Sequence, residues 1–352
     1  MRNIRLQGER HGAVVEVDAT NDDRASVDRV RLVEGRAGRV FLTRGGNLVR
    51  VAEESCDIVW KVSLNQVVEE GNAQGTWFSV TLVDTELVCL SRSGAIVTVD
   101  PSSGGCTLVG EFEHGIHSGA WSPDREVLVL VTLAESEDDT DSAPSSALLC
   151  MTADFQVLAE IPMEPHEVKE DVHVVWRPDG TFLGINSVDQ ADQQRKIRIY
   201  QRDPFQLSAL GRSEDGSGKL VANIQSTPLA WAGPGCSQLM ACIIPKGRKA
   251  MQVAFLEPNG LRHGQFLLRL DDATQSSVQG IAWNAASDLF MIHVREQHYD
   301  SVQLWTRSNY HWYLKWNRFF SERCSGIKFD EEEAYLVDIL LQTGEWREYK
   351  LR

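Results

Sequence analysis

The alternation of apolar and polar positions is clearest between Gly280 and Trp316, where it predicts four short β-strands separated by polar turns. The predicted strands are Gly280–Trp283, Leu289–Arg295, Val302–Arg307 and Tyr310–Trp316, with a tight Ser308-Asn309 turn before the last. Apolar and aromatic residues occupy both faces of the second strand, which indicates that both faces of this small sheet are covered. If each face is covered by another four-stranded sheet of the same kind, the sheets form a ring, with each sheet as one blade.

The same pattern recurs along the chain. A tryptophan that ends a short apolar strand is followed each time by a turn, an apolar strand and a second hairpin, with 55, 55 and 52 residues between successive copies, at Trp121, Trp176, Trp231 and Trp283. Four strands in a period of about 40–50 residues is the sequence signature of a β-propeller. The pattern therefore predicts an all-β protein of the WD40-type β-propeller class.

Two further blades are predicted before Trp121, because strand patterns and turn residues continue toward the N-terminus. Their strands are Arg29–Val33, Arg39–Arg44, Leu48–Ala52 and Asp57–Leu64, then Trp77–Val83, Glu86–Ser91, Ala95–Asp100 and Cys106–Phe112. The acidic, serine-rich stretch Glu135–Ser146 lacks large apolar residues and is predicted to be a disordered loop inside the third blade.

The last repeat, Gly326–Arg352, provides three strands and lacks a fourth. Proteins avoid an open sheet edge, so we expect Arg2–Leu6 or Gly12–Ala19 to pair with the Glu345–Leu351 strand and close the ring. The prediction is then a single seven-bladed propeller over residues 1–352, with six blades as the alternative.

Composition and charge narrow the classes of partner. The 352 residues carry a net charge of −15, which repels nucleic-acid phosphates and favours protein partners over RNA. No apolar run approaches the roughly 18 residues that span a bilayer, and the first residues lack the apolar segment of a secretory signal. The seven cysteines contain no C-x-x-C pair, which indicates a reducing intracellular compartment.

No motif for catalysis, for cofactor binding or for metal binding stands out. Gly211–Leu220 resembles a phosphate-binding loop, but Ser213 and Leu220 stand where the motif needs glycine and Ser or Thr. His293 lies in an apolar strand and is predicted to be a core histidine with a hydrogen-bond partner. We therefore expect no enzyme activity. A propeller enzyme with a central-channel site is a third hypothesis, which would need carboxylates and histidines where the repeats carry Trp, Ala and Val.

Several segments resemble one family, that of the largest subunit of the Elongator complex, elongator complex protein 1. Leu304–Lys315 (LWTRSNYHWYLK) and Asn259–Leu267 (NGLRHGQFL) resemble its most specific motifs. AWSPD at Trp121, WRPDG at Trp176 and RKIRIYQR from Arg195 agree in the same order. The resemblance runs from Ser118 to Arg352 and is weaker before. One segment departs from the family, because Glu160–Val175 lacks its GWG…TQF…G pattern.

The resemblance implies a non-catalytic scaffold propeller, the N-terminal part of a longer chain, that supports modification of wobble uridines in transfer RNA. The implied partners are other Elongator subunits, including a catalytic radical-SAM acetyltransferase-like subunit and a second propeller subunit. No strong direct RNA binding, no membrane and no cofactor are expected, and the expected location is the cytoplasm, with the nucleus as a second compartment. A generic WD40 adaptor of another complex is the alternative.

Two turns are the candidate partner-binding surface, because they are rich in the arginine and aromatic residues favoured at interface hot spots. The candidate residues are Arg262, His263, Trp305, Arg307, Asn309, Tyr310, His311 and Trp312.

Overall fold

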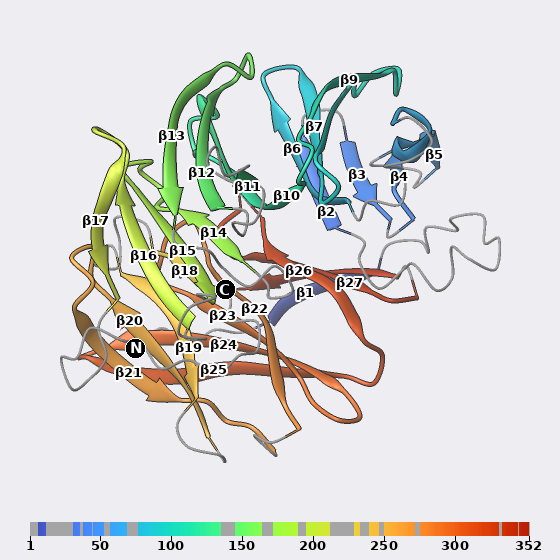
Figure 1. Ribbon diagram of the computed structural model, residues 1–352. Coiled ribbons are helices and arrows are strands. Elements are labelled where there is room, and N and C mark those ends of the chain that lie inside the picture. Colours follow the sequence, from blue (N-terminus) through green and yellow to red (C-terminus); the bar gives the residue numbers. More distant parts are fainter. Residues whose placement is uncertain are drawn as a thin grey trace.

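The computed structural model shows seven four-stranded antiparallel sheets that follow one another in chain order, from blue to red in Figure 1. It describes residues 6–11, 31–35, 38–43, 45–52, 57–68, 77–134, 145–163, 172–188, 195–211, 229–232, 239–245, 250–271, 275–330, 333–343 and 345–351. The predicted seven-bladed β-propeller is confirmed, and the six-bladed alternative is wrong.

The first two blades contain strands close to those that the sequence predicts, and the strands of the third follow the same order. They are β2 (Arg31–Gly35), β3 (Gly38–Leu42), β4 (Asn47–Val51) and β5 (Ile58–Ser63); β6 (Trp77–Val83), β7 (Glu86–Ser91), β8 (Ala95–Val99) and β9 (Cys106–Glu111); and β10 (Ile116–Trp121), β11 (Val127–Ala134), β12 (Ser145–Thr152) and β13 (Val157–Met163). The predicted disordered loop Glu135–Ser146 is wrong at its end, since Ser145 and Ser146 belong to β12. Residues 135–144 lie outside the described residues.

The last four blades repeat this order, and the seventh takes its outermost strand from the N-terminal region. Their strands are β14 (His173–Trp176), β15 (Phe182–Val188), β16 (Arg195–Gln201) and β17 (Gln206–Leu210); β18 (Leu229–Trp231), β19 (Met240–Pro245), β20 (Met251–Leu256) and β21 (Arg262–Leu267); β22 (Ser277–Trp283), β23 (Phe290–Arg295), β24 (Asp300–Ser308) and β25 (His311–Phe320); and β26 (Cys324–Phe329), β27 (Leu336–Leu341), β28 (Trp346–Leu351) and β1 (Leu6–His11).

The hydrophobic core is divided among the seven contacts between neighbouring blades. In β23, Phe290 and Ile292 pack toward blade five, whereas Met291 packs toward blade seven. The β-pleat sends successive side chains to opposite faces, so each middle strand contributes to two interfaces. The smallest of these clusters, which includes Phe41 and Trp346, joins blade seven to blade one. This arrangement explains why apolar residues occupy both faces of the predicted strands.

The recurring tryptophans occupy equivalent sites, as predicted. Each is the last residue of an innermost strand, and Trp121, Trp176 and Trp231 are buried while Trp283 is half-buried against the cluster between blades five and six. A tight turn follows. The residue four positions after the tryptophan has a left-handed φ, at Arg125, Gly180 and Ser287.

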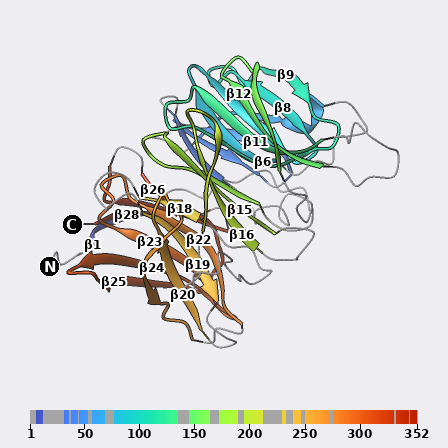
Figure 2. The ribbon, with the colours of Figure 1, turned by 60° about the vertical axis from the view of Figure 1, so that its left-hand side comes forward.

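The ring is closed by β1, which pairs with β28 from Leu6↔Leu351 to His11↔Arg347 (Figure 2). The Tyr349 hydroxyl donates to Glu9 Oε1 at 2.9 Å. The closing strand is therefore neither of the two expected segments: it begins at Leu6, the last residue of Arg2–Leu6, and Gly12–Ala19 lies outside the described residues. Alternation alone missed this strand because LQGERH is largely polar, as suits an edge strand that faces solvent.

Candidate partner-binding surface and inter-blade pocket

The two predicted turns lie on neighbouring blades and contact each other. Arg262 and His263 begin β21, the outermost strand of blade five, and the other residues lie in the β24–β25 hairpin of blade six. The link is a hydrogen bond of 3.3 Å from Arg307 Nη2 to His263 Nε2. We call the solvent-facing group Arg262, His263, Arg307, Asn309, Tyr310 and His311 the hairpin patch.

A chain of polar contacts holds Arg307 in the hairpin patch. Because a guanidinium only donates, His263 Nε2 is the acceptor and the other ring nitrogen, Nδ1, donates to Glu257 Oε1 at 2.9 Å. The Arg307 guanidinium lies 5.3 Å from the centre of the Tyr310 ring. Such a cation–π contact orients both side chains without burying either.

The tip of the hairpin is a two-residue turn in which both residues are left-handed. Asn309 has φ 48° and Tyr310 has φ 64°, and the flanking Ser308 and His311 pair across the turn. The predicted Ser308-Asn309 turn is therefore one residue too early. Glycine is preferred at such positions, and a tyrosine there is unusual. Its side chain is 84% exposed, so the turn presents a large aromatic ring to solvent.

The structure corrects the candidate set at two tryptophans. Trp305 is only 4% exposed and belongs to the core between blades five and six, so it has no accessible face for a partner. Trp312 is half-buried and stacks on Phe255 of blade five, with 4.5 Å between ring centres and 8° between ring planes. Both tryptophans pack the blades together. Sequence reasoning could not separate them from Tyr310, because the bulge between Leu304 and Trp305 shifts the strand register.

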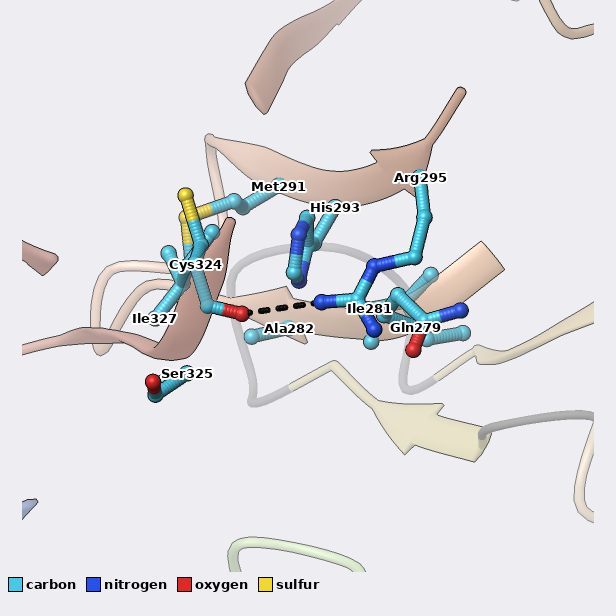
Figure 3. A pocket seen from close by; sticks show the side chains of 11 residues that line it. Gln279, Ile281, Ala282, Met291, His293, Arg295, Cys324, Ser325 and Ile327 are labelled. Carbon is cyan, nitrogen blue, oxygen red and sulfur yellow. Dashed lines mark hydrogen bonds between the residues drawn. The ribbon is translucent and has the colours of Figure 1, made fainter. Parts of the chain in front are cut away.

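A second region, which sequence reasoning missed, is a pocket of about 240 Å³ between blades six and seven. Figure 3 shows that its residues come from three strands: Gln279, Ile281 and Ala282 from β22, Met291, His293 and Arg295 from β23, and Cys324, Ser325 and Ile327 from β26. Polar and apolar side chains therefore share one recess between the inner strands of blades six and seven.

Beside this pocket lies a fully buried carboxylate, Asp300, which begins β24. Its oxygens accept hydrogen bonds from His293 Nε2 at 3.0 Å and from Arg323 Nη1 at 2.7 Å. Arg295 adds two more at 3.2 Å, and the backbone N–H of Cys324 adds one at 2.9 Å. The predicted core histidine is thus confirmed, with Asp300 as its partner.

The Asp300 network sets the protonation of its members. Burial alone would raise the pKa of Asp300, but the hydrogen bonds from His293, Arg295, Arg323 and Cys324 outweigh it and hold the pKa well below the ordinary value. Burial lowers the pKa of His293, so its ring is neutral near pH 7 despite the adjacent carboxylate. Burial also raises the pKa of the Cys324 thiol to about 12.

His293, Asp300 and Cys324 could be taken for a metal site, because their potential ligand atoms lie within 4.8 Å of one another. The donor chemistry does not fit. Two guanidinium groups already contact the carboxylate and repel a cation, and the buried thiol keeps its proton at neutral pH. The network is instead an inter-blade connection, since Arg323 precedes β26 and also donates to Glu296 O and Gln297 O of blade six.

Comparison with known proteins identifies the family of this ring. A family model described as the ELP1 first N-terminal beta-propeller matches residues 1–175 and 169–332. The chain belongs to this family. The two matched pieces meet within Glu160–Val175, the connection in which the sequence departs from the family pattern.

Three relatives of this ELP1 propeller each bear the name Elongator complex protein 1. The mouse protein is 30% identical over 288 residues, which cover 68% of this chain and 20% of the mouse protein. The Drosophila melanogaster protein is 27% identical over 318 residues, 80% of this chain and 24% of its own length. The Schizosaccharomyces pombe protein is 27% identical over 278 residues, 65% of this chain and 20% of its own length. The chain thus spans about a fifth of the length of these relatives.

Solved structures support the fold alone. One chain of a mitotic checkpoint complex crystal structure superposes with a TM-score of 0.65 at 13% identity, covering 99% of this chain and 93% of that one. The Cps50 (Swd1) β-propeller domain of Myceliophteria thermophila superposes with a TM-score of 0.58 at 11% identity, covering 97% and 99%. Within the described residues, no helix is long and apolar enough to cross a membrane.

Proposed function

We propose that this protein is a non-catalytic scaffold propeller of an Elongator-type complex, which supports modification of wobble uridines in transfer RNA by a separate catalytic subunit. The observation that carries this proposal is the family match, which extends over residues 1–332 and so over most of the ring. The relatives are named as subunits of the Elongator complex, and they supply the assembly in which this propeller would act.

The architecture suits a scaffold role. A closed ring with a core shared at every blade contact is rigid, and rigid elements that present loops are effective binding surfaces. The buried carboxylate beside the inter-blade pocket, Asp300, is paired with two arginines, so it is a poor general base. The chemistry of the complex would therefore come from a partner, the radical-SAM acetyltransferase-like subunit, in the cytoplasm.

The hairpin patch is the surface that we assign to a protein partner. Tyr310 offers an exposed ring on a rigid turn, and Arg307 has no carboxylate partner among the described residues. Tyrosine and arginine are the residue types that most often dominate binding energy at protein interfaces. The net charge of −15 argues against the alternative that the same patch binds RNA strongly.

The test is co-purification of the catalytic Elongator subunit with the full-length protein that carries Arg307→Ala and Tyr310→Ala. We expect the double variant to weaken retention at least about tenfold, the effect of one hot-spot residue. A matched control changes Val157 and Leu158 of β13 to Ser, because both are 59% exposed but lie on blade three. Loss of binding in the control only, or full retention by both, would remove the hairpin patch from the interface.

A titration of labelled transfer RNA with the isolated propeller tests the protein–RNA distinction. We expect only weak, non-specific association, with Kd around 10⁻⁴ M or weaker at physiological salt. Sub-micromolar binding that is abolished by Arg307→Ala would contradict the scaffold assignment.

A further inference from the structure

The two innermost strands that flank the pocket between blades six and seven each carry a β-bulge, as β6 and β10 also do. The register of β22 shifts between Val278 and Gly280, and that of β26 shifts between Cys324 and Gly326. Gln279 and Ser325 are the extra residues at these bulges, and both line the pocket. Bulges re-aim side chains and commonly lie beside binding sites.

Gly280 leaves the pocket open. A Cβ atom built on Gly280 would meet no heavy atom within 4 Å. The space beside Gly280 is therefore not filled by packing. The pocket has a volume of about 240 Å³.

The charge around the pocket is positive in a strongly acidic protein. The Arg295 side chain is 33% exposed, and two of its three nitrogens bind Asp300, with Nη2 also donating to Cys324 O at 3.1 Å (Figure 3). Among the described residues, none accepts a hydrogen bond from the third nitrogen, Nη1. Arg323 is the second cation on Asp300, so the group of three carries a net charge of +1.

The other lining groups suit a negatively charged oxygen. Of the described residues that line the pocket, none is a carboxylate, and the Gln279 amide and Ser325 hydroxyl are the polar groups on the flanking bulges. His293 is held on Asp300 and does not repel or attract an anion by charge. The apolar side chains of Met291 and Ile327, which belong to the core between blades six and seven, limit water beside the pocket and strengthen electrostatic attraction.

We propose that this pocket binds a small oxyanion, a carboxylate or phosphate group, on Nη1 of Arg295. The volume lies below the roughly 300–1,000 Å³ of pockets for drug-sized ligands, so the site takes an acidic group and not a whole cofactor. This assignment goes beyond the scaffold function and does not depend on it, since the hairpin patch is built on the outer hairpins of blades five and six.

The test uses inorganic phosphate as the probe and phosphorus NMR line broadening as the readout, with the folded chain at constant ionic strength. We expect saturable broadening that acetate reverses by competition, which distinguishes a shared oxyanion site from a phosphate-specific one. Gly280→Val should weaken binding about tenfold or more by filling the pocket, and Arg295→Gln should do the same by removing the donor.

Two matched variants separate the pocket from general effects. Gly264→Val adds a side chain at another open glycine, on β21, and Arg307→Gln removes a cation outside the pocket. Each of these two variants should broaden the phosphorus NMR signal of phosphate as much as the unchanged protein does. Equal broadening in Gly280→Val, or no saturable broadening in the unchanged protein, would overturn the proposal. If Arg295→Gln does not fold, Gly280→Ala and Gly280→Val decide the question, because neither removes a charge.

Discussion

At the residue scale, individual side-chain contacts between neighbouring blades hold the ring together. Asp300 begins a strand of blade six, yet it is satisfied by Arg323 and the Cys324 backbone at the entrance to blade seven. Burying a carboxylate is costly unless it is paired and fully hydrogen-bonded, and here each oxygen has at least two donors. Asp300 is thus a connection between two blades.

Removing the charge of Asp300 should therefore destabilise the ring strongly. We expect Asp300→Asn to lower the free energy of unfolding by about 3–5 kcal/mol, because two arginines lose their counter-charge. The matched control is Glu333→Gln, where an exposed carboxylate pairs with the exposed Lys350 at 2.8 Å and the loss should be about 0–1 kcal/mol. Urea denaturation measures both. Equal effects would contradict the inter-blade role.

The same contact predicts an acid dependence with a definite sign. The pKa of folded Asp300 lies below its ordinary value, so its contribution to stability is complete above about pH 4 and is lost as the pH falls further. The free energy of unfolding of the unchanged protein should fall between about pH 4 and pH 2. That of Asp300→Asn should depend less on pH in this range. Parallel pH profiles for the two proteins would refute this assignment.

The buried cysteines should be chemically inert in the folded chain. Burial raises the pKa values of Cys150, Cys242 and Cys324 to about 12, and only a thiolate reacts quickly with alkylating agents. At pH 8 we expect these three to be labelled at least about a hundredfold more slowly than in denaturant. Mass spectrometry of the labelled peptides gives the rate at each site. Rapid labelling of Cys324 would show that blades six and seven separate.

At the scale of the element, the repeat is a strand that ends in tryptophan, followed by a turn with a left-handed fourth residue. The tryptophan ring fills the contact with a neighbouring blade, and Trp176 also donates its indole N–H to Ala120 O of blade three at 3.1 Å. The indole N–H of Trp231 is buried without a partner among the described residues. Equivalent positions therefore share their packing but differ in their hydrogen bonds.

This difference can be measured with a matched pair of substitutions. Trp176→Phe and Trp231→Phe remove about the same volume, but only the first breaks a hydrogen bond. We expect Trp176→Phe to cost about 0.5–1.5 kcal/mol more than Trp231→Phe. Replacement of either residue by Ala should cost about 3–5 kcal/mol. Guanidinium unfolding compares the four variants, and a larger loss for Trp231→Phe would contradict the argument.

At the scale of the whole molecule, stability depends on closure of the ring. β1 covers the free edge of β28, and the innermost strands β2 and β26 contact each other at the junction of blades one and seven (Figure 1). The apolar cluster at that junction is small, so the pairing of β1 adds to a weak contact. Arg318 of blade six also approaches Glu9 of β1 at 3.6 Å.

Deleting residues 1–11 should lower the melting temperature by several degrees, because a full strand of backbone hydrogen bonds is lost and an edge is exposed. Deleting residues 1–5 is the control and should change the melting temperature little. Calorimetry gives both values. Unchanged melting in the longer deletion would mean that the ring does not depend on β1.

The amino-acid sequence alone specified the repeat, the strand boundaries to within a few residues, the need for a closing strand and the family motifs. These features are local, since a strand period, a tryptophan followed by a turn and a missing fourth strand can each be seen within one repeat. The contacts between residues of different strands and blades were decided by packing in three dimensions. That packing buried Trp305, exposed Tyr310, selected Leu6–His11 as the closing strand and joined Asp300 to Arg323 across two blades. Such contacts depend on bulges and on the packing of neighbouring blades, and no period along the chain encodes them.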